Sequence, residues 1–171
     1  MTNKPYDART DLEKCQSQWW KLTGLHNREE WSAALVRAAT AAEIACNFAI
    51  RTEFASQGNL RTDVVDKLLH DANGIQGKID RLLGPLVKGT GKESAVSGLK
   101  SLVKEINEAR NDIVHRGEFS DEDPATKTIE TARRFVEGLV RLYDPHFALQ
   151  DQKKRPTEDK RASHSFQPGT P

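Results

Sequence analysis

Apolar residues recur at spacings of three and four along five segments of the chain. This period places apolar side chains on one face of an α-helix, whereas a half-buried strand alternates apolar and polar residues. The chain has no convincing alternating run. The pattern therefore predicts an all-α protein, an up-and-down helical bundle of four to five helices.

The first two segments have recognisable ends. Thr10 and Glu13 form the T-x-x-E arrangement of a capping box, so the first helix is expected to begin at Thr10 and to end at Gly24. The second helix is expected from about residue 27 to 56. Its apolar residues cover well over a third of its circumference, which indicates a central helix or one at a subunit interface.

The middle of the chain predicts two further helices. The third covers about residues 60 to 86, and Gly74 and Gly77 are candidate bends within it. A loop rich in glycine and lysine separates it from the fourth helix, which is expected over about residues 94 to 116.

The last helix has a clear predicted start. Asp123 is the expected N-cap, and Pro124 occupies the first helical position, where its missing N–H is tolerated. The helix is expected to end before Pro145.

The chain has 171 residues, 36% of them hydrophobic, which suffices for one modest core with tails. We divide it into an N-terminal helix with its lead-in (1–27), a helical bundle (28–149) and a tail (150–171). The tail has no apolar period and is expected to be disordered. Because 26 basic residues nearly cancel 25 acidic ones, any nucleic-acid binding must come from a local site.

Cys15 and Cys46 lie within helical patterns and have no C-x-x-C or histidine-rich company. They are expected to be core thiols in a reducing compartment, and neither a metal nor a cofactor is predicted. The first residues contain no apolar leader, and no stretch approaches the roughly 18 apolar residues of a membrane span. A cytoplasmic protein that does not enter the membrane is expected.

Three stretches suggest chemistry but favour simpler interpretations. GPLVKGTGKES misses the G-x-x-x-x-G-K-[ST] spacing and follows no strand, so we interpret it as a loop. His70 and Asp71 have no nucleophile beside them, which favours a solvated helix edge. Trp19 and Trp20 could stack on a base, but the helical spacing favours Trp19 as a core residue, with Trp20 covering the margin of the core beside it.

The stretch RNDIVHRG, residues 110–117, lies at the end of the fourth predicted helix. The apolar face of that helix consists of Leu99, Leu102, Val103, Ile106, Ala109 and Ile113. Arg110 falls inside this arc, because successive residues are separated by about 100 degrees. An unpaired charge at a core is costly, so Arg110 requires an acid or an anion. Glu43 and Glu53 of the second helix could reach it, and Glu43 is the expected partner.

Asn111 and His115 are four residues apart and project from the same side of the helix, separated by about 40 degrees. Arg110 lies about 140 degrees from His115, although a long side chain could swing to meet the imidazole. A simple helix ending explains His115 and Arg116, because cations there favour the helix dipole and a following glycine caps the helix. It explains neither Arg110 nor Asn111.

The motif R-N-x-x-x-H in an all-helical setting resembles the R-x(4-6)-H signature of HEPN domains, over about residues 28 to 145. This resemblance implies a HEPN-like bundle that forms a homodimer, with two motifs facing each other. It also implies that Arg110 stabilises the phosphate, that Asn111 positions substrate or histidine, and that His115 transfers protons. The acid that orients the arginine would be Glu43. Arg116 is not part of the usual signature, and its role stays open.

Members of such families include metal-independent endoribonucleases of toxin–antitoxin and anti-phage systems. The expected function is therefore RNA cleavage by an arginine and histidine site, with a possible antitoxin or nucleotidyltransferase partner. Cleavage by the ribose 2′-hydroxyl needs a group that titrates near neutrality and a fixed positive charge. The alternatives are a non-catalytic helical module that binds a partner protein or nucleotide, and a regulator that binds an anionic ligand.

Overall fold

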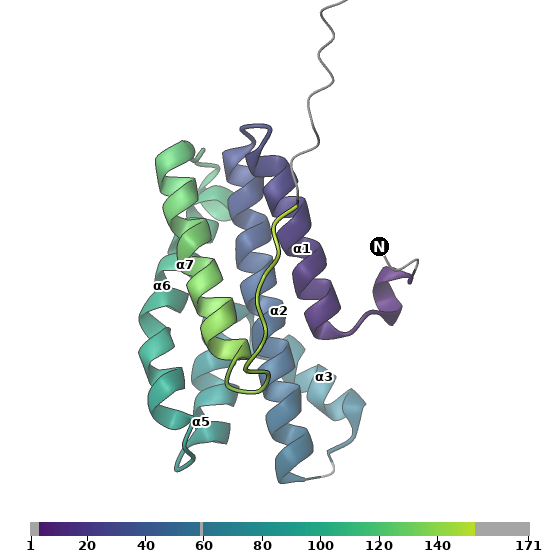
Figure 1. Ribbon diagram of the computed structural model, residues 1–171. Coiled ribbons are helices and arrows are strands. Elements are labelled where there is room, and N and C mark those ends of the chain that lie inside the picture. Colours follow the sequence, from purple (N-terminus) through teal and green to yellow (C-terminus); the bar gives the residue numbers. More distant parts are fainter. Residues whose placement is uncertain (1–3, 59, 153–171) are drawn as a thin grey trace, which may run out of the picture.

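The computed structural model describes residues 4–58 and 60–152, and every regular element in these ranges is helical. Four long helices form the bundle (Figure 1): α1 (Asp11–His26), α2 (Trp31–Gln57), α6 (Glu93–Arg116) and α7 (Glu122–Val140). A short 3-10 helix, η1 (Tyr6–Ala8), precedes α1. The all-α prediction is confirmed.

The central helix is α2, which packs against α1, α6 and α7. Its buried face contains small side chains that let neighbouring helices approach closely, and Ala38, Ala42, Ala45 and Ala49 have no exposed surface. Trp19 of α1 and Phe135 of α7 fill the space around it and are also fully buried. The N-terminal helix therefore shares one core with the rest of the bundle.

Both cysteines lie in this core, as the sequence predicted. Burial, followed by the nearby charge of Asp11, raises the pKa of the Cys15 thiol to about 12. Burial also raises the pKa of the Cys46 thiol. Neither thiol is a reactive thiolate at neutral pH.

By length and composition α2 is also apolar enough to cross a membrane, contrary to the sequence-based expectation that no stretch comes close. The core helix of a soluble bundle meets the same criteria. Because α2 has other helices packed on several sides, its apolar character is accounted for by the core it forms.

Several predicted helix ends need correction. The capping box at Thr10 is present, but α1 continues past Gly24 to His26, and a turn separates it from α2. Glu29 takes a left-handed backbone conformation in that turn, with φ of 62°, so α2 begins at Trp31. At the last helix, Asp121 is the N-cap instead of Asp123, which makes Pro124 the third residue of α7, within the first turn, where no intrahelical N–H donor is needed.

The predicted third helix is divided into α3 (Thr62–Asp71), α4 (Gly74–Lys78), the π-helical turn η2 (Ile79–Leu83) and α5 (Gly84–Val87). The break lies at Asn73 and Gly74, which have left-handed φ values of 54° and 73°. Gly77 allows a close chain approach, since a Cβ there would lie 1.7 Å from the carbonyl oxygen of Ala72. The single bent helix predicted from sequence is therefore wrong.

The segment after α7 runs back along α1. Gln150 exchanges hydrogen bonds with Gln16, and the Trp19 indole donates to the Asp151 carboxylate at 2.9 Å. Arg133 pairs with the same carboxylate. The expected disordered tail therefore does not begin at 150, because polar contacts hold residues 150 and 151 where an apolar period is lacking. Residues 153–171 lie outside the described part of the chain.

Candidate functional site

The predicted motif occupies the last two turns of α6. None of the last ten residues of this helix is buried, although Val103 and Ile106 before them are. Ala109 and Ile113, which the periodicity placed in the core, are only half-buried. The end of α6 therefore projects beyond the best-packed part of the bundle.

The three motif side chains contact one another. The Arg110 guanidinium donates from Nη1 to Asn111 Oδ1 at 3.2 Å and approaches His115 Nε2 at 3.2 Å. An arginine can only donate, so His115 Nε2 can take part in this contact only as an acceptor. The long arginine side chain thus reaches the imidazole, as the helix spacing allowed.

The helix ending supplies a structural role for two neighbours. Gly117 caps α6 in the left-handed conformation, with φ of 69°. Arg116 pairs with Asp112 at 2.8 Å, one turn earlier on the same helix. Arg116 is thus occupied locally, whereas Arg110 and His115 meet each other.

The predicted partner of Arg110 is wrong. Glu43 pairs with Lys78 of α4 at 2.7 Å, and the alternative acid, Glu53, pairs with Lys92 at 2.9 Å. Across residues 4–58 and 60–152, no ion pair joins Arg110 to a carboxylate. The guanidinium is half-buried and its described polar partners are an amide oxygen and an imidazole nitrogen.

The antiparallel register of α2 and α6 explains this correction. Lys92 at the start of α6 contacts Glu53 near the end of α2. At about 1.5 Å per residue, Arg110 lies about 27 Å farther along α6, roughly level with Leu35. Glu43 is then about 12 Å away along the axis. Periodicity gives the face of a helix but not this register between helices.

Glu53 belongs to a buried network at the opposite end of α6. Its carboxylate, 2% exposed, accepts hydrogen bonds from Lys92, Tyr143 and Gln57. Burial acts to raise the pKa of Glu53, but the hydrogen bonds from Lys92 and Tyr143 and the Lys92 charge outweigh it and lower the pKa. Burial and the Glu53 carboxylate both raise the pKa of Tyr143.

One face shared by α2 and α6, which we call the uncovered face, is only partly buried near the motif. Lys100 of α6 pairs with Asp80 of η2, and the helix period brings Asn111 and Val114 to nearly the same side as Lys100. On α2, the side of Glu43 that meets α4 continues to Val36. The short helices α3 to α5 gather at the other end of the bundle (Figure 1), and near the motif Val114 is 45% exposed and Val36 is half-buried.

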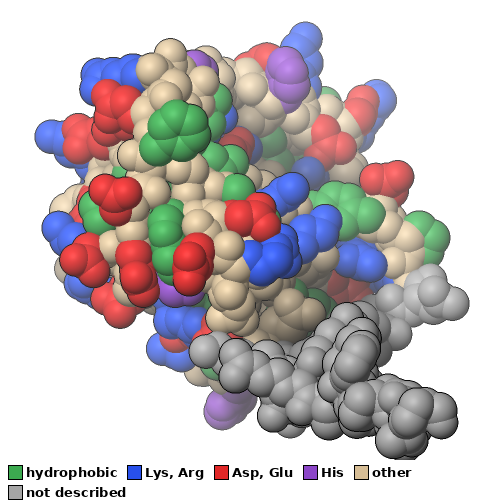
Figure 2. Space-filling model, turned by 90° about the horizontal axis from the view of Figure 1, so that it is seen from above, with side chains coloured by type: hydrophobic (Ala, Val, Ile, Leu, Met, Phe, Trp, Pro, Cys, Tyr) green, Lys and Arg blue, Asp and Glu red, His purple; other side chains and the backbone are tan. Residues whose placement is uncertain are grey.

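The end view shows local groups of like charge. Figure 2 looks down on the end where α6 terminates, and it shows a group of acidic side chains toward α6 and α7. A group of basic side chains lies nearer to α1. The near-zero net charge of the chain therefore conceals local fields.

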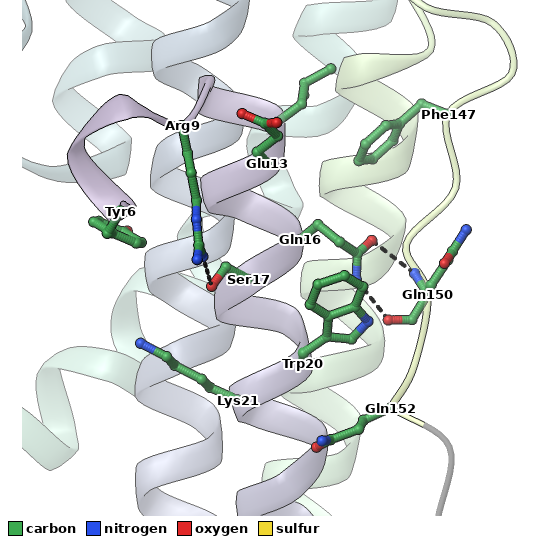
Figure 3. Close-up of a pocket in the computed structure, with 11 residues that line it drawn as sticks. Tyr6, Arg9, Glu13, Gln16, Ser17, Trp20, Lys21, Phe147, Gln150 and Gln152 are labelled. Atoms are coloured by element: carbon green, nitrogen blue, oxygen red, sulfur yellow. Dashed lines mark hydrogen bonds between the residues drawn. The ribbon is translucent and has the colours of Figure 1, made fainter. Parts of the chain in front are cut away.

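A groove of about 720 Å³ runs along α1 (Figure 3). Tyr6, Arg9 and Lys21 lie on one side of α1, and Trp20 and Phe147 lie toward the other. Tyr6 and its neighbours were not predicted from the sequence. The available signal was the seven-residue spacing of Lys14 and Lys21, which puts both on one helix face.

The other sequence candidates have ordinary structural roles. His70 is exposed and contacts Asp71 at 3.3 Å. In the glycine-rich loop, the Gly89 N–H donates to the Glu93 carboxylate, so an acid occupies the place a phosphate would need. Among the described residues, no group of three His, Cys, Asp or Glu side chains is placed to hold a metal ion.

Comparison of the chain with protein-family models, with curated proteins and with solved structures finds no match.

Proposed function

We propose that the protein is a metal-independent endoribonuclease of the HEPN kind, acting as a homodimer in a toxin–antitoxin or anti-phage setting. The observation that carries this proposal is the contact of Arg110 with both Asn111 and His115 at the exposed end of α6. The absence of a carboxylate partner for Arg110 in the described chain supports it. A guanidinium not paired with an acid retains donors for a phosphate.

The geometry suggests how these side chains act on RNA. A phosphate that enters the site competes with the His115 ring for the Arg110 donors and places their charge against the scissile group. This frees the His115 Nε2 lone pair, which takes the proton of the ribose 2′-hydroxyl. Asn111 Oδ1 keeps one guanidinium N–H fixed during the exchange.

The proposed dimer supplies the second half of the reaction. The leaving 5′-oxygen needs a proton from a second acid, and each chain offers one histidine in the motif. The uncovered face next to the motif contains Val36, half-buried, and Val114, 45% exposed. A second copy seated on this face would bury both residues and bring the two motifs together.

The test is cleavage of single-stranded RNA in the presence of EDTA. The expected products carry 2′,3′-cyclic phosphate ends, and light scattering after gel filtration should show a dimer. Cleavage that stops in EDTA, or products with 3′-hydroxyl ends, would contradict the proposed chemistry.

A second candidate, a non-catalytic module that binds a partner protein, is favoured by the loop after α6. Phe119 is 94% exposed, although hydrogen bonds fix the backbone on either side of it, at Glu118 and Ser120. Acidic Asp121 and Glu122 follow. An exposed aromatic ring beside acidic groups suits a basic protein surface, such as that of an antitoxin.

A further inference from the structure

A cluster of cations surrounds one exposed aromatic ring beside α1. Tyr6 on η1 is 39% exposed. Arg9 and Lys14 each approach its ring centroid to 5.7 Å, and Lys21 approaches it to 5.8 Å. Three positive side chains from separate turns thus converge on a single ring.

The ring is held in place. Gln18 Nε2 donates to the Tyr6 hydroxyl at 2.9 Å, and Arg37 of α2 donates to Gln18 Oε1 at 3.0 Å. Arg9 donates to Ser17 Oγ at 2.9 Å, which fixes a second side of the cluster. We call Tyr6, Arg9, Lys14, Lys21 and Arg37 the Tyr6 patch.

The patch has an uncompensated positive charge. Across the described residues, none of its four cations forms an ion pair with a carboxylate. Two nearby acids are already neutralised, because Glu13 pairs with Lys4 and Asp11 pairs with Arg51. Asp7, exposed on η1, is the acid that remains beside Tyr6. Four cations against one acid attract an anion in a chain whose total charge is nearly balanced.

The patch opens onto the groove along α1 (Figure 3), whose volume of about 720 Å³ can hold a nucleotide or more. Trp20, half-buried at the same groove, offers a second aromatic surface. An aromatic face for a base with cations beside it for phosphates is the combination found in single-strand binding surfaces.

One residue of the patch, Arg37, stands at about the same height on the bundle as the motif, although α1 and α6 lie on different sides of it (Figure 1). Arg37 directly follows Val36, which belongs to the uncovered face of α2. Arg110 lies roughly level with Leu35 by the register of α2 and α6, so Arg37 and the motif stand at similar heights on the bundle.

We propose that the Tyr6 patch binds single-stranded RNA, stacking a base on Tyr6 and holding the adjoining phosphates with its cations. This inference rests on the proposed endoribonuclease function and assigns the surface that holds the strand outside the cleavage site. An acidic peptide would use the cations but would leave the aromatic ring without a matching planar group.

The test measures binding of a fluorescent single-stranded RNA to the full chain in the His115→Ala background, so that cleavage does not interfere. Tyr6→Ala should weaken binding about 5- to 150-fold, the range for loss of one base stack. Tyr6→Phe keeps the ring and should bind nearly as well as its parent. Circular dichroism of each variant checks that the bundle is folded.

The charge contribution is measured by salt dependence. Replacing both Lys14 and Lys21 with glutamine should reduce the slope of log affinity against log salt by about 1.4, because each single-strand phosphate contact contributes about 0.7. The matched control replaces Lys67 and Lys88, which are exposed on α3 and in the loop after α5, and should leave the slope unchanged.

The outcomes separate the two proposals. If RNA binding depends on Tyr6 but the protein cuts no RNA, the proposed RNA-binding patch is supported and the proposed nuclease function is contradicted. If the protein cleaves RNA but binds it equally well after Tyr6→Ala and after the double lysine replacement, the proposed patch is contradicted. The proposed nuclease function is then supported. Binding of polyglutamate with no binding of RNA would assign the patch to acidic peptides and contradict the inference.

Discussion

Each end of α6 carries a cation, Lys92 at the start and Arg110 at the end, and the two cations have different partners. At the start, Lys92 contacts the buried Glu53 carboxylate, which Tyr143 and Gln57 also approach. At the end, Arg110 meets only Asn111 and His115 among the described residues. The first arrangement satisfies a buried acid and therefore serves stability. The second leaves a charged group without an acid, which is the condition for binding an anion.

The largest expected effect is on activity at the Arg110 end. Arg110→Ala should lower the rate of RNA cleavage about 100- to 1000-fold, because it removes the donor at the transition-state charge. The free energy of unfolding should change by no more than about 0.5 kcal/mol, since no described ion pair is broken. Arg110→Lys keeps the positive charge but loses the planar pair of donors with which a guanidinium binds a phosphate. This variant should stay folded but have low activity. If Arg110→Ala lowers the stability of the fold, the role of Arg110 is structural and the predicted catalytic role is contradicted.

At the Glu53 end the same kind of change should act on stability. Glu53→Ala removes the acceptor shared by Lys92 and Tyr143 and should cost about 2–3 kcal/mol of unfolding free energy in urea. Glu53→Gln keeps an oxygen acceptor and should cost less. The folded fraction should still cleave RNA. Unchanged stability in Glu53→Ala would remove the contrast between the two ends.

Double-mutant cycles at Glu43, in the middle of α2, test whether this acid is coupled to Lys78 or to Arg110. Glu43→Ala leaves the nearly buried Lys78 without its partner and should cost about 1–2 kcal/mol. Its effect should add to that of Arg110→Ala, because the two sites share no contact, but should couple to Lys78→Met. Coupling between Glu43 and Arg110 in urea unfolding would contradict the observed pairing.

The smallest expected effect is the acid dependence of stability. The pKa of Glu53 is lower in the folded protein than its ordinary value of 4.5. Its stabilising contribution is therefore present above about pH 4.5 and is lost as the pH falls through the folded pKa. Between pH 6 and pH 3, the wild type should lose more stability than Glu53→Gln. Equal losses would show that Glu53 does not titrate as the structure implies.

Sequence periodicity predicted the helical class and most of the long helices because each has a regular apolar face. It also identified the three motif residues, whose contacts depend only on spacing within α6. It failed at the partner of Arg110, because the register between α2 and α6 is set by packing at a distance.

The missed features depend on local backbone and on long-range contacts. The break at Asn73 depends on left-handed backbone that the leucine pattern conceals. The Tyr6 patch combines η1, α1 and α2, and its tie to Arg37 through Gln18 cannot be read from any one helix. The contact of Asp151 with Trp19 joins residues far apart in the chain.

The most direct test of the central claim compares two exposed histidines in the RNA cleavage assay with EDTA. His115→Ala should lower the rate of cleavage by about 100-fold or more, because His115 transfers protons in the proposed reaction. It should unfold like the wild type, because His115 is exposed. His70→Ala, which removes an exposed histidine on α3, should retain full activity. Equal activity of the two variants would show that the end of α6 is only a helix ending and would contradict the account.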